Sequence, residues 1–185
     1  SICERLVSLQ GGTIGVSSVQ GHGSRFWFQL PLRSIAIKEA QAAAEMARML
    51  VDKPIQVLLV DDNAVNLLVA RMMLKKCFPK AQIVEASSGA IALEKLREQH
   101  FDLTLMDMVM PEMDGMQVTR TLREEFPAPA CHMPVLALTA SANPVDQDRC
   151  LASGMNDVVH KPLDEQQLIS KISNALAMHA LRGGE

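Results

Sequence analysis

Residues 55–180 alternate regularly between short apolar runs and helical patterns, and this alternation leaves few folds open. The apolar runs show no polar face, which is typical of strands in a parallel sheet that helices cover on both sides. Strands are expected at residues 55–60, 82–86, 102–106, 134–140 and 157–160, and helices at 63–77, 88–99, 115–126, from 143 onward, and at 164–180. The pattern therefore predicts an α/β fold of five βα units.

The handedness of the connections restricts the order of these strands. Crossovers between parallel strands are almost always right-handed, which leaves a handful of topologies for five βα units. The flavodoxin-like order 2-1-3-4-5 suits a segment of this size. We therefore expect a doubly wound parallel sheet in that order.

Polar residues stand where the predicted strands end, at the edge where open parallel sheets bind ligands. They are Asp61 and Asp62 after the first strand, Asp107 after the third, Thr139 at the end of the fourth and Lys161 after the fifth. Strands also end in polar residues simply because they reach solvent, and for any one of these residues that explanation is sufficient. It is weak for five residues that together suit one chemistry.

That chemistry is the binding of a phosphoryl group beside a metal ion. Three neighbouring carboxylates repel one another unless a cation neutralises them, and oxygen ligands suit Mg²⁺. Lys161 and Thr139 would then contact phosphoryl oxygens as a charge and as a hydrogen-bond donor. Asp107 stands alone in the sequence at the central strand, so it is the expected nucleophile, forming an aspartyl-phosphate.

Four motifs in order resemble the receiver domain of two-component response regulators. They are Asp61-Asp62, DMVMPEMDG at 107–115, LTA at 138–140 and HKP at 160–162. The resemblance covers residues 54–180.

The resemblance implies specific roles for these residues. Asp107 would be the phosphoacceptor, and Thr139 and Lys161 would bind the phosphoryl oxygens. Mg²⁺ or Mn²⁺ would be held by Asp61, Asp62, Asp107 and the backbone carbonyl of Val109. Helix 63–77, with Asn66, Leu67, Ala70 and Met73, would dock the partner, although core packing explains some of these apolar residues equally well. The segment also departs from the family, since Val158 stands where an aromatic switch residue is common.

Two other functions use similar parts. A metal-dependent phosphohydrolase with an aspartate nucleophile commonly needs a second acid two residues later, and that position is Val109. A receiver that only binds proteins and is never phosphorylated would be expected to lose its acids or Lys161, and this chain keeps them.

Residues 1–33 resemble the end of the ATPase domain of sensor histidine kinases. A helix is expected at 1–9 and a hairpin of strands at 13–19 and 25–31. Residues of the closing pattern GxGSxFxFxLP are Gly21, Gly23, Ser24, Phe26, Phe28, Leu30 and Pro31. An ordinary helix and hairpin is the alternative. Residues 34–53 are Ala-rich with a helical stripe, which predicts a linker helix, and residues 181–185 form a tail.

The resemblances together imply the C-terminal part of a hybrid histidine kinase within a phosphorelay. We expect this chain to lack a complete ATP site, and none of its five histidines is followed by Glu, as a phosphoacceptor histidine of the family usually is. It would therefore catalyse only its own phosphorylation and dephosphorylation. Its partners would be a phosphohistidine-bearing kinase or a histidine phosphotransfer domain.

Composition argues against other partners. The net charge of −3 gives no bulk attraction to nucleic acid or to anionic lipid. The longest apolar run is too short to span a bilayer, so no membrane contact by this chain is expected. The four cysteines form no C-x-x-C pair and are interpreted as reduced thiols of a cytoplasmic protein. A membrane anchor elsewhere in a longer parent protein stays open.

Overall fold

A computed structural model describes residues 2–9, 11–21, 23–31, 53–141 and 143–182. The chain divides into two compact units, Ser1–Gln41 and Ala42–Glu185. The predicted linker helix at 34–53 lies almost entirely outside the described residues. Among the helices of the described ranges, none combines the length and apolarity needed to cross a membrane.

The first unit consists of a helix and an antiparallel hairpin, as predicted. Helix α1 spans Ile2–Leu9, and strands β1 (Thr13–Val19) and β2 (Gly23–Gln29) pair along their whole length. The second strand begins two residues earlier than expected because the turn is tighter. One face of the hairpin carries exposed apolar side chains: Ile14, Val16, Phe26 and Phe28.

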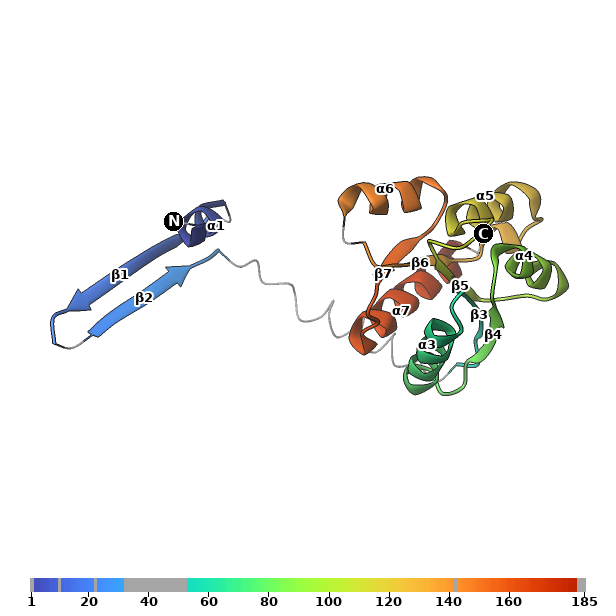
Figure 1. Cartoon of the computed structure of the whole chain (residues 1–185), viewed down its shortest axis with the longest axis horizontal. Coiled ribbons are helices and arrows are strands. Elements are labelled where there is room, and N and C mark those ends of the chain that lie inside the picture. Colours follow the sequence, from blue (N-terminus) through green and yellow to red (C-terminus); the bar gives the residue numbers. More distant parts are fainter. Residues whose placement is uncertain (1, 10, 22, 32–52, 142, 183–185) are drawn as a thin grey trace. The chain divides into compact units, whose positions relative to one another are not determined.

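The second unit is a parallel five-stranded sheet with helices on both faces (Figure 1). The strands are β3 (Gln56–Val60), β4 (Gln82–Ala86), β5 (Leu103–Asp107), β6 (Val135–Thr139) and β7 (Asp157–His160). The helices are α3 (Ala64–Cys77), α4 (Gly89–Glu98), α5 (Gly115–Glu125), α6 (Pro144–Ala152) and α7 (Glu165–Arg182), with a short 3-10 turn at Ala130–His132. The spatial order β4-β3-β5-β6-β7 is the predicted order 2-1-3-4-5.

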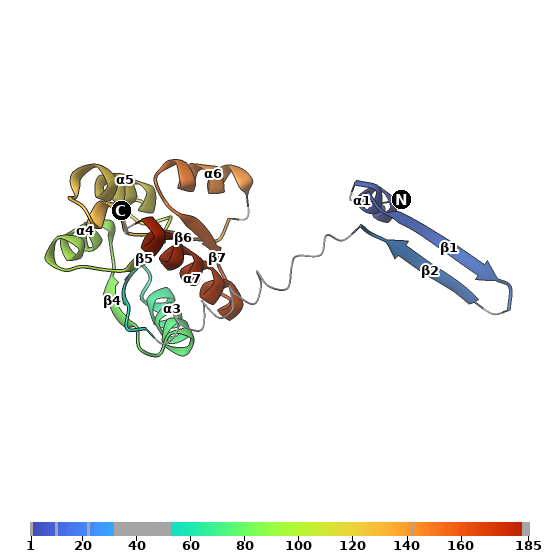
Figure 2. The same cartoon turned by 180° about the vertical axis from the view of Figure 1, so that it is seen from behind.

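Alternate residues of the central strands supply two separate cores. Leu58, Val60, Met106 and Ala137 point to the face covered by α4, α5 and α6. Their neighbours Val57, Leu59, Leu105 and Leu138 point to the face covered by α3 and α7. Figures 1 and 2 show these two helix groups from opposite sides. Burial on both faces explains why the strands read as unbroken apolar runs.

Helix α3 carries apolar residues on two sides, and only one of these sides is buried. Its core face is Leu67, Ala70, Leu74 and Cys77, and Met73 is half-buried. Four further apolar residues of this helix are exposed, namely Val65 (65%), Leu68 (46%), Val69 (50%) and Met72 (64%). Helix α3 therefore carries an exposed apolar face besides its core face. The same burial removes Leu67 and Ala70 from the predicted docking surface.

Arg123 ties the C-terminal end of α5 to the starts of β6 and β7. Its guanidinium donates to the carbonyls of Cys131, Met133 and Gly154 at 2.8, 2.9 and 2.9 Å, and to Oδ1 of Asn156 at 3.1 Å. Burial lowers its pKa, yet the planar fork satisfies each of these acceptors. One side chain thus joins three segments that are far apart in the sequence.

Arg123→Lys is expected to lower the free energy of unfolding by about 2 kcal/mol, because an ammonium cannot reach the same set of acceptors. Arg120 lies on the same helix and is exposed. The matched change Arg120→Lys should alter stability by less than about 0.5 kcal/mol. Urea unfolding followed by circular dichroism measures both, and equal losses in the two variants would contradict this role.

Candidate functional site

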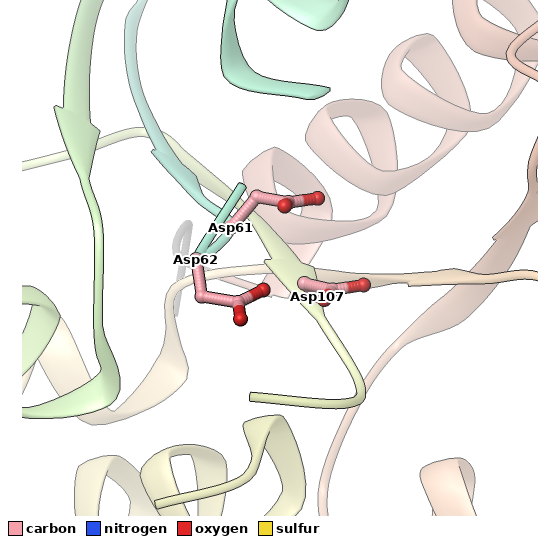
Figure 3. Close-up of side chains that lie close together, drawn as sticks. All are labelled: Asp61, Asp62 and Asp107. Carbon is pink, nitrogen blue, oxygen red and sulfur yellow. The ribbon is translucent and has the colours of Figure 1, made fainter. Parts of the chain in front are cut away.

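Three aspartates meet at the carboxyl ends of two neighbouring strands. Asp61 and Asp62 follow β3, and Asp107 is the last residue of β5, which pairs with β3 in parallel. One ligand oxygen from each carboxylate lies within 4.8 Å of the others. Figure 3 shows the three side chains together at this edge of the sheet. The predicted convergence of these acids is therefore present in the structure.

Lys161 joins two of the three carboxylates. Its Nζ donates to Asp61 Oδ2 and to Asp107 Oδ1, both at 2.7 Å. Lys161 follows β7, at the far side of the sheet from β3, and its backbone N–H donates to the carbonyl of Thr139 at 2.7 Å. The ammonium therefore reaches from β7 across the ends of β6 and β5 to the acids.

Asp61 is held more tightly than the sequence suggested. It is 1% exposed, and its Oδ1 accepts the backbone N–H of Asn63 at 2.9 Å and the side-chain amide of Asn66 at 3.0 Å. The contact with Asn66 was missed, because that residue was considered only as part of a docking surface. Its place in the first turn of the helix that follows the acids was the available signal.

Thr139 lies at the end of β6 and is 9% exposed. Its hydroxyl oxygen accepts the backbone N–H of Ser141 at 3.0 Å, and the Ser141 hydroxyl in turn contacts Asp146 at 2.6 Å. The Thr139 oxygen keeps its own hydrogen for another acceptor. The predicted hydroxyl therefore stands at the same sheet edge as the acids, anchored by the loop into α6.

The environment shifts the pKa of two of these groups in ways that matter for chemistry. Burial raises the pKa of the Asp107 carboxyl and the nearby charge of Asp61 adds to this, while the contact with Lys161 opposes it. For Lys161, burial disfavours the charge, but hydrogen bonds to Asp107 and Asp61 outweigh burial and raise its pKa. The lysine charge is therefore favoured by its two carboxylate partners, and burial disfavours the charged form of Asp107.

This raised pKa predicts a pH-dependent gain of stability in Asp107→Asn. A carboxyl whose pKa is higher in the folded than in the unfolded state stabilises the fold only while protonated. Stability is therefore lost as the pH rises above the ordinary value of 3.8 and through the folded-state pKa. In urea unfolding with EDTA, the free energy of unfolding of Asp107→Asn relative to the wild type should increase as the pH rises through this range. At neutral pH the increase should be on the order of 1 kcal/mol. A stability difference that is independent of pH would contradict it.

The loop after Asp107 packs directly against the start of α5. A Cβ on Gly115 would lie 2.3 Å from the backbone oxygen of Asp107, so no other residue fits there without movement. Asp114 caps α5 by accepting the backbone N–H of Gln117 at 2.7 Å. Val109, between these points, is 82% exposed and leaves its surroundings open to solvent.

The donor set fits a hard divalent cation. Three carboxylates, of which Asp62 is exposed, and one ammonium leave a formal charge of −2 at this edge of the sheet. Oxygen atoms from Asp61, Asp62 and Asp107 are the ligand type that Mg²⁺ prefers. The acidic cluster is thus a candidate divalent-cation site beside the expected nucleophile.

A family model for the response regulator receiver domain matches residues 57–173. Two curated relatives match nearly the whole chain. The chain is 35% identical to "Hybrid signal transduction histidine kinase K" of Dictyostelium discoideum over 95% of its length, and 36% identical to "Sensor histidine kinase AruS" of Pseudomonas aeruginosa over 91%. It spans only 15% and 16% of the length of these two relatives.

Solved structures share the fold of this chain. The receiver domain of a sensor histidine kinase from Pseudomonas aeruginosa PAO1, solved with a magnesium ion coordinated in its active site cleft, is 31% identical with a TM-score of 0.60; the match covers 68% of this chain and 99% of that one. A putative response regulator from Chloroflexus aurantiacus is 27% identical with a TM-score of 0.62, over 68% of this chain and 99% of that one. Fold, strand-end residues and family match agree: the chain belongs to the response regulator receiver domain family, with sensor histidine kinases among its relatives.

Proposed function

We propose that this receiver takes a phosphoryl group from a phosphohistidine onto Asp107 and relays it to a histidine phosphotransfer protein. The observation that carries the proposal is the placement of Lys161, 2.7 Å from Asp107, beside three acids within 4.8 Å of one another. Neither the phosphohydrolase reading nor a purely protein-binding receiver is favoured by the family match.

In the proposed reaction, a carboxylate oxygen of Asp107 bonds to phosphorus while the phosphorus–nitrogen bond of phosphohistidine breaks. The imidazole leaves with the bonding electrons and takes up a proton. Lys161 and the Thr139 hydroxyl hold the phosphoryl oxygens and stabilise their charge. We assign the site for Mg²⁺, or Mn²⁺, to Asp61, Asp62, Asp107 and the Val109 carbonyl, and a cation there would offset the negative charge on the phosphoryl group.

The partner is proposed to dock on the exposed apolar face of α3. This face consists of Val65, Leu68, Val69 and Met72. Helix α3 begins directly after Asp61 and Asp62, so a protein bound along it can present its histidine at the acids. Apolar side chains in such a group suit a protein surface rather than an ionic ligand.

The rest of the chain fits a hybrid histidine kinase. We propose that residues 1–33 are the end of its ATPase domain, 34–53 a linker, 54–180 the receiver and 181–185 a tail. Two observations support this: the matches to the two kinases named above extend beyond the receiver to 95% and 91% of the chain, and the hairpin exposes an apolar face that a larger domain would cover. We place the receiver in the cytoplasm, with any membrane anchor elsewhere in the parent protein.

Incubation of the full chain with acetyl phosphate tests the function. With Mg²⁺ present, intact mass should rise by one phosphoryl group, and hydroxylamine should remove it, as expected for an acyl phosphate. With EDTA in place of Mg²⁺, labelling should fall at least about 100-fold. No mass gain with Mg²⁺, or a label that resists hydroxylamine, would overturn the proposal.

A further inference from the structure

Asn66 reaches back from the first turn of α3 to the buried carboxylate of Asp61. Its Nδ2 donates to Asp61 Oδ1 at 3.0 Å, and the same oxygen accepts the backbone N–H of Asn63 at 2.9 Å. Asp61 Oδ2 accepts Lys161 Nζ at 2.7 Å. Each oxygen of Asp61 therefore accepts at least one hydrogen bond from this chain, and together these bonds fix the orientation of the carboxylate.

The two side chains that hold Asp61 differ in charge. Lys161 carries a positive charge at the acidic cluster, so it competes electrostatically with a bound cation. The Asn66 amide is neutral and orients Asp61 without reducing the negative charge of the cluster. A neutral donor of this kind can hold the acid in place in both the cation-free and the cation-bound site.

A structural explanation for Asn66 is weak. The residue is exposed, and asparagine is a poor helix former. Alanine at this position would therefore make the helix itself more stable. The N-cap function is already met by Asn63, whose Oδ1 accepts the backbone N–H of Val65 at 2.8 Å. The hydrogen bond to Asp61 therefore explains why asparagine occupies this position.

We propose that Asn66 is a positioning residue of the phosphoryl-transfer site, which orients Asp61 and thereby sets the affinity of the acidic cluster for a divalent cation. The inference rests on the proposed function. Groups that hydrogen-bond to metal-binding side chains typically change metal affinity by about 10- to 100-fold when removed. Asn66 acts through Asp61 and does not itself contact the phosphoryl group.

Calorimetric titration of the full chain with Mg²⁺ tests this role. Asn66→Ala is expected to raise the Kd for Mg²⁺ about tenfold. Asn174→Ala makes the same change at an exposed position of α7, outside the acidic cluster, and should leave the Kd unchanged within about twofold. A Kd in Asn66→Ala within twofold of the wild type would overturn the proposal, even if the melting temperature fell.

Labelling with acetyl phosphate at increasing Mg²⁺ gives a second readout. For Asn66→Ala, the Mg²⁺ concentration at half-maximal rate should rise about tenfold while the plateau rate stays within about threefold of the wild type. A lower plateau with an unchanged midpoint would assign Asn66 to phosphoryl transfer instead and overturn the inference. Loss of Mg²⁺ binding or labelling in the wild type would contradict the proposed function, so the two failures are distinguishable.

Discussion

Asp107→Asn is expected to abolish phosphoryl labelling, with a rate at least about 10³-fold below the wild type. The carboxamide is a far weaker nucleophile than the carboxylate. Asp107 is the member of the acidic cluster that lies on the central strand β5, where Lys161 contacts it. Incubation with acetyl phosphate and Mg²⁺, followed by intact mass, should show a gain of one phosphoryl group in the wild type alone. The variant should remain folded, since the substitution removes a poorly solvated charge.

Two matched Asp→Asn variants make this result specific. Asp148 is exposed on α6, and Asp148→Asn should label like the wild type. Asp62 belongs to the acidic cluster, so Asp62→Asn should label more slowly and recover at higher Mg²⁺. Label that persists on Asp107→Asn protein would move the nucleophile to another residue.

Lys161→Met is expected to damage both stability and reaction. It removes an ammonium that bridges Asp61 and Asp107, whose side chains are only 2% and 10% exposed. Removing one partner of a buried ion pair typically lowers the free energy of unfolding by about 3–5 kcal/mol. Because Lys161 is partly exposed, we expect a smaller loss of about 2–3 kcal/mol in EDTA. Labelling should slow by at least about 100-fold, because the phosphoryl oxygens lose their charged donor.

The control for this change is another lysine–aspartate pair of the same unit. Lys171 contacts Asp157 at 2.6 Å, but their side chains are 33% and 38% exposed. Lys171→Met should therefore cost less than about 1 kcal/mol and leave labelling unchanged. Urea unfolding in EDTA compares the two variants directly. Similar losses of unfolding free energy in both variants would contradict the expected stabilising role of Lys161 between Asp61 and Asp107.

Most of the receiver fold could be predicted from the sequence because its strands are buried on both faces. Runs such as residues 55–60 and 102–106 admit few other environments, and chirality then fixes the order of strands. The convergence of Asp61, Asp62, Asp107 and Lys161 followed from the same topology, because residues after parallel strands share one edge.

The rest depended on contacts that no local pattern encodes. The sequence does not decide the core face of α3, because Val65 and Leu67 are both apolar and only packing against β3 and α7 buries Leu67. The role of Asn66 depends on the direction of a side chain relative to Asp61. Arg123 binds acceptors up to 33 residues away, and its spacing in the helix gives no sign of this.

The close approach of Gly115 to the backbone of Asp107 has a mechanical consequence. With no side chain between them, the first turn of α5 contacts the peptide group of Asp107 directly. A displacement of the start of α5 would therefore also displace Asp107, so the position of this helix and the geometry of the acidic cluster are coupled.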